Sequence, residues 1–458
     1  MVVGDLATAV DVVVLGAGPG GYVAAIRLGQ LGRKVVIVDP GPPGGTCLNE
    51  GCIPSKALLS AADNYWRARS FGEMGVCVDG VHIDFGRMQA WKCGIVERLT
   101  KGVRQLLEGY GVQIVHGLGW FLADKEVRVE GENGSLRYSF DNCIIAVGAA
   151  PAALPGLDFD GERVLTPTQA LQLPDLPSSL TIIGSDYVAA ELATIYGKLG
   201  VAVRLLIPAG RKLLEDFDPT AGRLVQAGLK KLGVKVETNV ADPAAALNGD
   251  HPVVVSEGVA PRTADLHLHT VHVETDERGF LPVDDRLRTN NPAIYAVGDV
   301  TGGLPLATIA IKQAKVAAES IAGLPAQYAP QAVPKVVWSE PPVAAVGMSA
   351  AEAEAAGYDV VTGRFPLAAS GRALTLAAPD GSVLTVAEKD SGVLLGATII
   401  GARAGELVGE VALAMEMGAT LTDLAETLHP HPGLPETIQE SAEAALGATV
   451  HLLKPTGA

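Results

Sequence analysis

Hydrophobic residues near the start of the chain form two short runs, separated by a segment of helical periodicity. The first run, Asp11 to Leu15, is followed by a glycine-rich turn, and the second, Val35 to Val38, ends at Asp39. Short apolar runs bounded by turn residues are typical of strands that are buried on both faces. The pattern therefore predicts a strand–helix–strand unit with parallel strands.

The turn after the first predicted strand has GxGxxG spacing at Gly16, Gly18 and Gly21. In a dinucleotide-binding unit the first glycine permits a tight turn and the second lets a pyrophosphate approach. The third lets the helix pack closely on the strand. Asp39, at the end of the second strand, can accept a hydrogen bond from a ribose hydroxyl. Together these features predict dinucleotide binding.

The same pattern occurs a second time. A shift of 168 residues places Gly16 on Gly184 and Gly32 on Gly200 without a gap. An internal repeat of this kind indicates two copies of one structural unit. The chain is therefore predicted to contain two dinucleotide-type units, an arrangement that suits electron transfer between two cofactors.

The second copy differs from the first at two positions where ligand binding needs a particular residue. Asp186 replaces Gly18, which puts a carboxylate where a phosphate should come closest, and Ile207 replaces Asp39. Arg211 and Lys212 follow and would suit a 2′-phosphate, but nothing nearby replaces the pyrophosphate glycine. Two interpretations stay open: the unit still binds its nucleotide, or it keeps only the fold.

The remaining chain suggests further elements. Helices are expected at about 57–70 and 86–107, a hairpin at 127–130 and 136–140, and a buried strand at 143–147. An apolar stripe on the second helix predicts core or helix-pair packing; it comprises Trp91, Ile95, Leu99 and Leu106. From residue 333 strands and helices mix, as in an α+β domain.

The predicted fold class is α/β, with two Rossmann-like units and a C-terminal α+β domain. The expected domains are 1–150, 151–272, 273–332 (a segment completing the first unit) and 333–458.

Composition narrows the function classes. A formal net charge of −16 over 458 residues argues against a nucleic-acid partner, which would need a basic face. Neither a long apolar run nor a secretory signal is recognisable, so a cytoplasmic protein with no membrane association is expected.

Cys47 and Cys52 lie in the stretch from Gly44 to Lys56, between a Gly/Pro-rich loop and a predicted helix. Their spacing would let them form a pair if Cys47 lay in the entry turn of the helix. A helix N-terminus lowers a thiol pKa and favours the reactive thiolate. The spacing alone also allows two buried structural thiols or a structural disulfide. The chain has five cysteines, too few for a disulfide scaffold.

Two groups of histidines are candidates for chemistry. His431 precedes Glu436 at the start of the last predicted helix, so the pair could serve as a general base and the residue that orients it. The second group, His267, His269 and His272, could form a metal site, although a plain surface strand is the simpler interpretation. No metal site is predicted.

Taken together, these motifs resemble the dihydrolipoamide dehydrogenases, which are FAD-dependent pyridine nucleotide–disulfide oxidoreductases. The stretch GGTCLNEGCIPSK, residues 44–56, is similar to the redox-disulfide motif of this family almost letter for letter. The segment 296–299 matches its second FAD motif, and 338–342 and 429–436 match its dimerisation domain. The stretch around Trp91 resembles the members that serve 2-oxoacid dehydrogenase complexes.

The resemblance implies a homodimer that oxidises a lipoyl-bearing protein or a small dithiol, with FAD bound and NAD as electron acceptor. It implies a Cys47–Cys52 disulfide, attacked at Cys47 after His431 of the partner subunit deprotonates the substrate, with Glu436 orienting that histidine. The implied cofactor-binding residues are Gly16, Gly18, Gly21, Asp39, Gly45, Thr46, Lys56, Gly148, Glu191, Asp299, Leu306 and Ala307.

The departures from the family pattern concentrate in the nicotinamide half. Besides Asp186 and Ile207, the segment 256–263 lacks the paired arginines of the family. Three hypotheses follow: an NAD-linked dihydrolipoamide dehydrogenase, a dithiol oxidoreductase that has lost nicotinamide binding and uses another acceptor, or a non-enzymatic docking subunit. The intact cysteines, His431 and Glu436 argue against the third.

Overall fold

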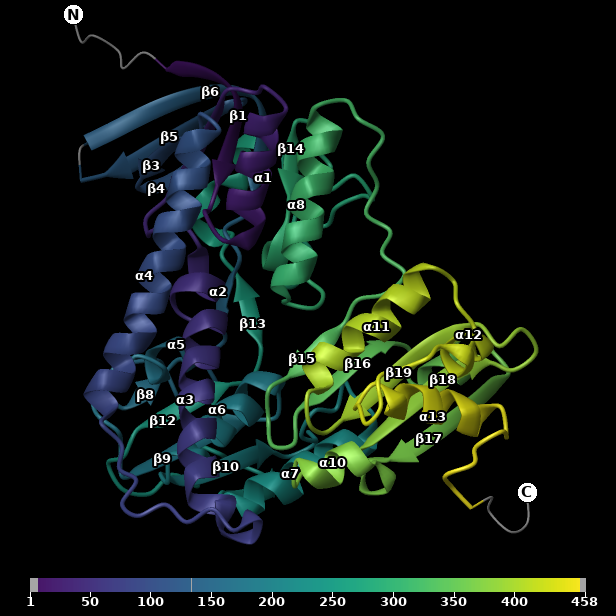
Figure 1. Ribbon diagram of the computed structural model, residues 1–458. Helices are drawn as coiled ribbons and strands as arrows, with labels where there is room; N and C mark the ends of the chain where they lie inside the picture. Colours follow the sequence, from purple (N-terminus) through teal and green to yellow (C-terminus); the bar gives the residue numbers. More distant parts are fainter. Residues whose placement is uncertain (1–6, 133, 454–458) are drawn as a thin grey trace, which may run out of the picture.

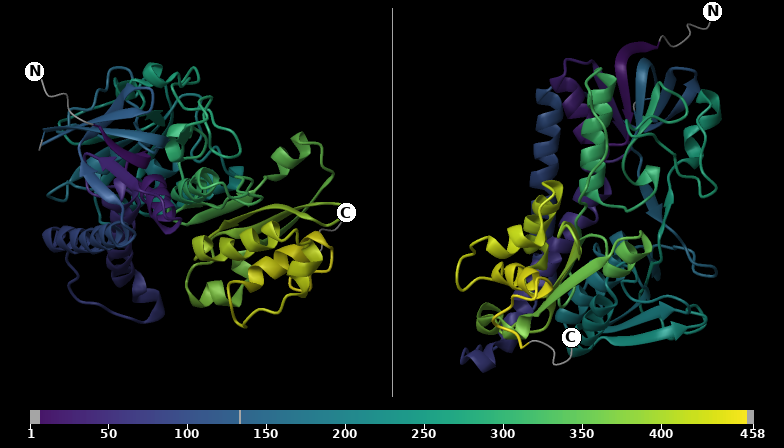
Figure 2. Two further views of the ribbon diagram at one scale, coloured as in Figure 1. Left: turned by 90° about the horizontal axis from the view of Figure 1, so that it is seen from above. Right: turned by 90° about the vertical axis from the view of Figure 1, so that its right-hand side faces the viewer.

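The computed structural model describes residues 7–132 and 134–453, so Asn133 of the predicted hairpin turn and the chain ends lie outside the described residues. Figure 1 shows two α/β units stacked one above the other, with a smaller α+β domain beside the lower one. In Figure 2 this third domain projects to one side of the two units. The observed architecture confirms the predicted fold class.

The first unit is built on a largely parallel sheet with strand order β3-β2-β1-β6-β5-β4, and β14 pairs with the C-terminal end of β6 on the edge opposite β1. Its strands are β1 (Thr8–Leu15), β2 (Val35–Asp39), β3 (Gln113–His116), β4 (Leu118–Ala123), β5 (Glu126–Gly131), β6 (Gly134–Ile145) and β14 (Ile294–Ala296). Because β14 comes from far along the chain, the segment after the second unit returns to complete the first sheet.

Helices α1 (Pro19–Gln30) and α8 (Ala307–Ile321) pack side by side against this sheet (Figure 1). An ion pair at 2.7 Å between Arg27 and Glu319 joins them. Gly20 lets α1 approach the returning segment closely, because an added Cβ would lie 3.0 Å from the side chain of Val297, which follows β14. The two helices therefore fix the returning segment against the start of the chain.

The second unit has five parallel strands in the order β11-β10-β9-β12-β8. They are β8 (Val164–Leu165), β9 (Ser179–Gly184), β10 (Ala202–Pro208), β11 (Lys235–Val240) and β12 (Val253–Ser256). The repeat seen in the sequence is kept in the pairing: Val12 pairs with Val35 in the first unit, and Leu180 pairs with Val203 in the second. Helix α6 (Tyr187–Lys198) follows β9 and is buried along most of its length.

The C-terminal domain contains an antiparallel sheet in the order β15-β16-β19-β18-β17. Its strands are β15 (Lys335–Val337), β16 (Val343–Gly347), β17 (Val360–Pro366), β18 (Ser382–Glu388) and β19 (Leu394–Ile400). Helices α11 (Ala404–Glu416) and α13 (Glu436–Ala445) cover it. Within the described part of the chain, no helix combines the length and the apolarity needed to cross a bilayer.

Three local expectations were wrong. The predicted hairpin is present, since β5 pairs antiparallel with β6, but its arm at 136–140 and the strand at 143–147 are not separate: they belong to one continuous strand, β6, which pairs with both β5 and β1. The histidine segment is two 3-10 turns, Ala264–Leu266 and Leu268–Val271, instead of a strand. In these turns His267 and His272 have positive φ, which extended backbone does not allow.

The third concerns helix α4 (Phe85–Gly109), whose apolar stripe is not core. Trp91 and Leu106 are about half exposed in the single chain, and the buried face carries Phe85, Val103 and Leu107 instead. The stripe adjoins the buried face, since Leu99 and Val103 are four residues apart, so periodicity alone could not tell which part of this surface meets the protein.

Candidate active site

Cys47 and Cys52 lie on two separate helices that meet at a tight turn. Cys47 is in the short helix α2 (Gly45–Asn49), and Cys52 is the first residue of α3 (Cys52–Ser70). Cys52 is therefore at the N-terminus of the long helix, and Cys47 lies in the short helix that leads into it. Both residues are free thiols in this structure, so a disulfide between them stays a prediction.

The two thiols have pKa values shifted in opposite directions. A hydrogen bond to Cys52, together with burial, raises the pKa of Cys47. The same hydrogen bond lowers the pKa of Cys52 despite burial, and the ammonium of Lys56 adds to this effect. The arrangement favours a thiolate on Cys52 stabilised by a thiol on Cys47, which is the form a reduced dithiol pair needs to give up electrons.

Lys56 is held beside the cysteines by a helix of the second unit. Its Nζ lies 2.6 Å from Glu191 Oε2, and the side chain of Glu191 is only 7% exposed. The other carboxylate oxygen of Glu191 accepts the backbone N–H of Trp338 at 3.0 Å. The predicted pairing of Lys56 with Glu191 is thus present, and it connects three parts of the chain.

The N-terminus of α1 has room for a phosphate. Gly18 is its N-cap with φ −68°, and α1 has no side-chain cap. An added Cβ at Gly18 would meet only the Cα of Gly45, at 3.9 Å, so the fold itself does not require glycine there. Free backbone N–H groups at a helix N-terminus and an open space beside them suit a pyrophosphate.

Asp39 already holds the turn before this helix. Its Oδ2 accepts the N–H of Ala17 at 2.6 Å and its Oδ1 accepts the N–H of Gly41 at 2.7 Å. Each carboxylate oxygen has a second lone pair, which leaves acceptor capacity for a ribose hydroxyl. The residues of the first unit therefore fit FAD.

The other predicted cofactor residues come to the same edge of the first sheet. Gly148 follows β6 with φ +71°, and Asp299 lies in the 3-10 turn Gly298–Thr301 that follows β14. Burial raises the pKa of Asp299. Leu306 is the N-cap of α8, whose first residue is Ala307, and Thr46 lies in α2 next to Gly45. Parallel strands end at one edge, which is where α/β sheets bind their ligands.

His431 and Glu436 form a pair in the C-terminal domain. The carboxylate Oε1 of Glu436 lies 2.7 Å from Nδ1 of His431, and Oε2 accepts the N–H of Gly433 at 2.6 Å. Although burial raises the pKa of Glu436, these two hydrogen bonds hold it below its usual range. An ionised Glu436 can fix the histidine ring and stabilise its protonated form. The His431 side chain is 82% exposed, so its other nitrogen is accessible.

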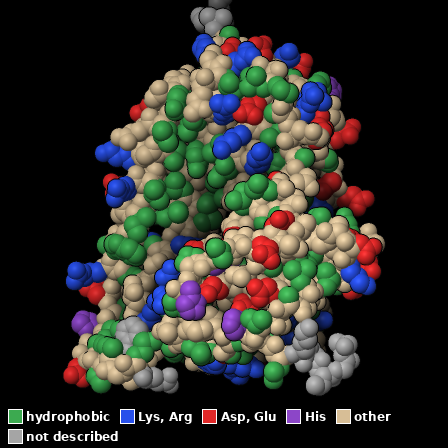
Figure 3. All heavy atoms as spheres, turned by 45° about the vertical axis from the view of Figure 1, so that its right-hand side comes forward, with side chains coloured by type: hydrophobic (Ala, Val, Ile, Leu, Met, Phe, Trp, Pro, Cys, Tyr) green, Lys and Arg blue, Asp and Glu red, His purple; other side chains and the backbone are tan. Residues whose placement is uncertain are grey.

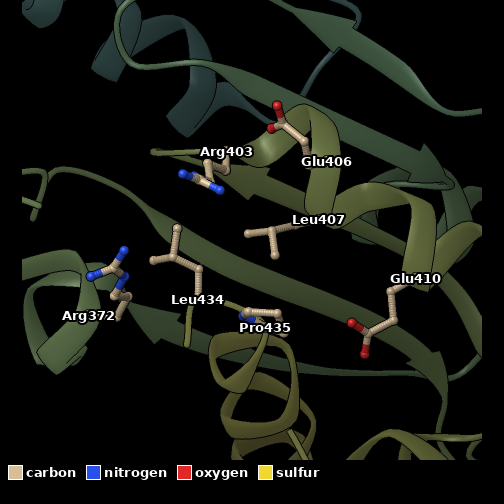
Figure 4. A pocket seen from close by; sticks show the side chains of 7 residues that line it. All are labelled: Arg372, Arg403, Glu406, Leu407, Glu410, Leu434 and Pro435. Carbon is tan, nitrogen blue, oxygen red and sulfur yellow. The ribbon is translucent and has the colours of Figure 1, made fainter. Parts of the chain in front are cut away.

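A cavity of about 310 Å³ opens beside this pair, lined by Arg372, Arg403, Glu406, Leu407, Glu410, Leu434 and Pro435 (Figure 4). Glu410 Oε1 also lies 2.7 Å from Nε2 of His429, whose side chain is 5% exposed. Buried His429 is therefore a structural residue of the loop, whereas His431 is the exposed one.

Within one chain the cysteines and His431 are not brought together. Figure 1 shows α2 and α3 in the stacked units and α13 on the outer side of the dimerisation domain. Figure 3 shows apolar side chains gathered in the hollow between the first unit and that domain. Exposed apolar surface of this kind marks protein interfaces. The separation of His431 from the cysteines within one chain is compatible with the predicted homodimer.

Comparison with known proteins decides the family. The family model described as pyridine nucleotide-disulphide oxidoreductase matches residues 10–314, and the model of its dimerisation domain matches residues 333–442. The chain belongs to the pyridine nucleotide–disulphide oxidoreductases. Dihydrolipoyl dehydrogenases of Bacillus subtilis and Geobacillus stearothermophilus are 41% and 42% identical to it, over 99% of this chain and 100% of each relative.

Solved structures of this oxidoreductase family have the same fold. LpdA of Mycobacterium tuberculosis superimposes with a TM-score of 0.87 and 26% identity, covering 95% of this chain and 99% of that one. The copper complex of the flavoprotein disulfide reductase RclA of Escherichia coli gives 0.85 and 25% over the same shares. The predicted flavoprotein disulfide oxidoreductase with a dimerisation domain is confirmed.

One residue of this oxidoreductase site was not foreseen. Tyr187 is the first residue of α6, and burial raises its pKa, as do the nearby charges of Glu191, Asp186 and Cys52. It is therefore a buried residue of the second unit that lies near both Cys52 and Asp186. Only its place directly after Asp186 in the repeat could have indicated it from the sequence.

Proposed function

We propose that this enzyme oxidises dihydrolipoyl groups carried by a partner protein, or small dithiols of the same kind, through Cys47 and Cys52. The observation that carries the proposal is the placement of Cys52 at the start of α3, where Cys47 and Lys56 lower its pKa. The dihydrolipoyl dehydrogenases similar to the whole chain support the substrate class.

The proposed reaction begins with the pair oxidised to a disulfide. His431 of the partner subunit takes a proton from one substrate thiol, whose sulfur bonds to Cys47 while Cys52 leaves as a thiolate. The second substrate thiol then attacks the substrate sulfur of this mixed disulfide, and Cys47 leaves as a thiol. The substrate is oxidised to a disulfide and the cysteine pair is reduced by two electrons. Bound FAD would accept this electron pair from the Cys52 thiolate.

The proposal also includes the domain boundaries, the FAD-binding residues, the partner and the location. Residues 1–150 and 273–332 form the FAD domain, 151–272 the second unit and 333–458 the dimerisation domain. FAD is held by the glycines of α1, by Asp39 and by the residues at the carboxyl ends of β6 and β14. The host is a lipoyl-bearing protein of the 2-oxoacid dehydrogenase type, and the location is the cytoplasm.

Anaerobic stopped-flow mixing with dihydrolipoamide tests the proposal. The flavin absorbance of the enzyme should bleach or shift within one turnover. A Cys47→Ser variant should keep its flavin but lose this reduction by at least about a thousand-fold, because no other sulfur can form the mixed disulfide. Cys77→Ser, a change of an exposed cysteine outside the site, serves as the matched control. Reduction that survives in Cys47→Ser would contradict the assignment.

A subunit-mixing experiment tests the shared active site. Dimers of Cys47→Ser and of His431→Gln are each expected to be inactive. In a mixed dimer, one site has an intact cysteine pair and an intact histidine from the other chain, so random exchange should restore about a quarter of the activity. If the histidine acted within its own chain, mixing would restore none.

A further inference from the structure

We infer that, whichever dithiol this enzyme oxidises, its second unit does not bind a nicotinamide dinucleotide, because Asp186 fills the place of the pyrophosphate with the carboxylate of the chain itself. The family implies a nicotinamide nucleotide in this unit, and the residues present do not fit it.

The first step is that the turn carrying Asp186 has the geometry of the turn carrying Gly18. Gly18 has φ −68° and ψ −176°, and Asp186 has φ −81° and ψ 179°. Both residues are the N-cap of the helix that follows the first strand of their unit. The two backbones therefore present their helix N-terminus in the same way, and the difference between them lies in the side chain.

The second step is what that side chain does. Asp186 Oδ1 accepts the N–H of Ala189 at 2.8 Å, and both carboxylate oxygens lie 2.9 Å from the hydroxyl of Ser256. In the first unit the N-terminus of α1 has no such cap. A pyrophosphate bound at α6 would have to displace a carboxylate already hydrogen-bonded there, and would meet its negative charge at short range.

The third step concerns the other charges at the same sheet edge. Glu257 follows β12 directly, its side chain is 7% exposed, and its Oε1 has no hydrogen-bond partner among the residues that the structure describes. Of the two cations that could have favoured a phosphate, Arg211 lies 2.8 Å from Glu215 and 3.6 Å from Glu257, and Lys212 has an exposed side chain. The carboxyl ends of β9 and β12 therefore present two acids, and the nearby guanidinium is already shared between two carboxylates.

The fourth step is the ribose position. Ile207, which replaces the ribose-binding acid, is fully buried in the core of the unit. Ile207 is the equivalent of Asp39, at which β2 ends. Strand β10 does not end there but continues to Pro208, so the second unit extends its sheet where the first unit turns toward its ligand. Two independent changes thus remove the pyrophosphate site and the ribose acceptor.

The unit has a role that needs no nucleotide. From α6, Glu191 holds Lys56 beside the cysteines, and buried Lys198 lies 2.6 Å from both Asp63 of α3 and Glu340 of the dimerisation domain. These contacts explain why the fold of the unit is intact although its ligand positions are changed.

Titration of the FAD-loaded dimer with NAD⁺ and with NADH, followed by calorimetry, tests the inference. The wild-type enzyme should show no saturable binding up to millimolar nucleotide. Asp186→Gly removes the internal anion and should gain binding by at least about ten-fold, with ADP-ribose as a competitor. Asp218→Gly is the matched control, since Asp218 caps α7 (Pro219–Lys231) of the same unit through Thr220 without touching this turn.

Saturable wild-type binding below a millimolar, displaced by ADP-ribose, would overturn the inference. So would an Asp186→Gly variant that binds no better than Asp218→Gly. Neither result depends on dithiol oxidation, which is measured without nucleotide, so the dithiol chemistry and the nucleotide exclusion fail or hold separately.

Discussion

In the first unit an added Cβ at Gly16 would lie 2.3 Å from the carbonyl oxygen of Ala146, and in the second unit one at Gly184 would lie 2.3 Å from the carbonyl oxygen of Ser256. Glycine is required at both positions by the neighbouring strand. At Gly18, by contrast, an added Cβ would have its nearest described neighbour, the Cα of Gly45, only at 3.9 Å, and the second unit has Asp186 at this position. The first glycine of the motif is thus constrained by the fold and kept in both units, whereas the second is not constrained by the fold and is kept only in the first unit.

The largest expected effect is the loss of FAD affinity when the aspartate of the second unit is introduced into the first. Gly18→Asp gives the first unit the internal carboxylate of the second, and the chain has space for it. Like charges at about 4 Å repel by about 4 kcal/mol at an effective dielectric near 20, so FAD affinity should fall by about a thousand-fold. The ratio of flavin to protein absorbance after gel filtration measures this loss.

Gly18→Asn is the control for this change, because it adds a side chain of the same size and capping ability without the charge. It should retain more flavin than Gly18→Asp. A Gly18→Asp enzyme that keeps its flavin would show that a carboxylate at this position tolerates a pyrophosphate, and the contrast between the units would no longer explain nucleotide exclusion.

The second largest expected effect is on stability, when the residues at the ends of β2 and β10 are exchanged. Ile207→Asp buries a carboxylate in the core of the second unit and should lower the free energy of unfolding by about 3–5 kcal/mol. Asp39→Ile leaves the N–H groups of Ala17 and Gly41 without their acceptor and should cost about 1–3 kcal/mol for each. Urea unfolding midpoints of the FAD-loaded variants compare the two. Equal tolerance of both exchanges would show that the strand ends are interchangeable.

The smallest expected effect is a pH dependence. Burial raises the pKa of Asp186 to about 6, although hydrogen bonds from Ala189 and Ser256 oppose this. The folded state therefore binds more protons than the unfolded state between about pH 4 and 6, and stability falls as the pH rises through this window. Asp186→Asn lacks this loss, so its advantage over wild type should grow by about 1–3 kcal/mol from about pH 4.5 to 7.5.

Thermal unfolding of both proteins at the two pH values measures this difference. Asp218→Asn, which changes a cap in the same unit, is the control. A difference that stays constant with pH would mean that Asp186 is already ionised without cost in the folded protein.

Much of the fold could be predicted because the glycine spacing and strand periodicity are local. The gap-free shift of 168 residues predicted two units, and the structure keeps even the strand register. The redox stretch was recognisable for the same reason, since Cys47, Cys52 and Lys56 are close in sequence.

The rest depended on contacts between distant residues. The hydrogen bonds of Asp186 involve Ser256, seventy positions away, so the sequence could suggest repulsion but not that the carboxylate turns back to cap α6. The exposed side of α4 and the turns around His267 were likewise decided by which neighbours the other elements provide. The pairing of Lys56 with Glu191 needed a family resemblance, because no local pattern joins α3 to α6.

The ion pairs of α6 have a consequence for the symmetry of the dimer. Through Lys56 and Asp63 this helix sets the position of α3, and through Trp338 and Glu340 it sets that of the dimerisation domain. In the proposed dimer each chain contributes its cysteines to one active site and His431 to the other. A shift of α6 in one chain would therefore move the cysteines of one active site and the histidine of the other. This helix thus sets the geometry of two catalytic centres without being part of either reaction.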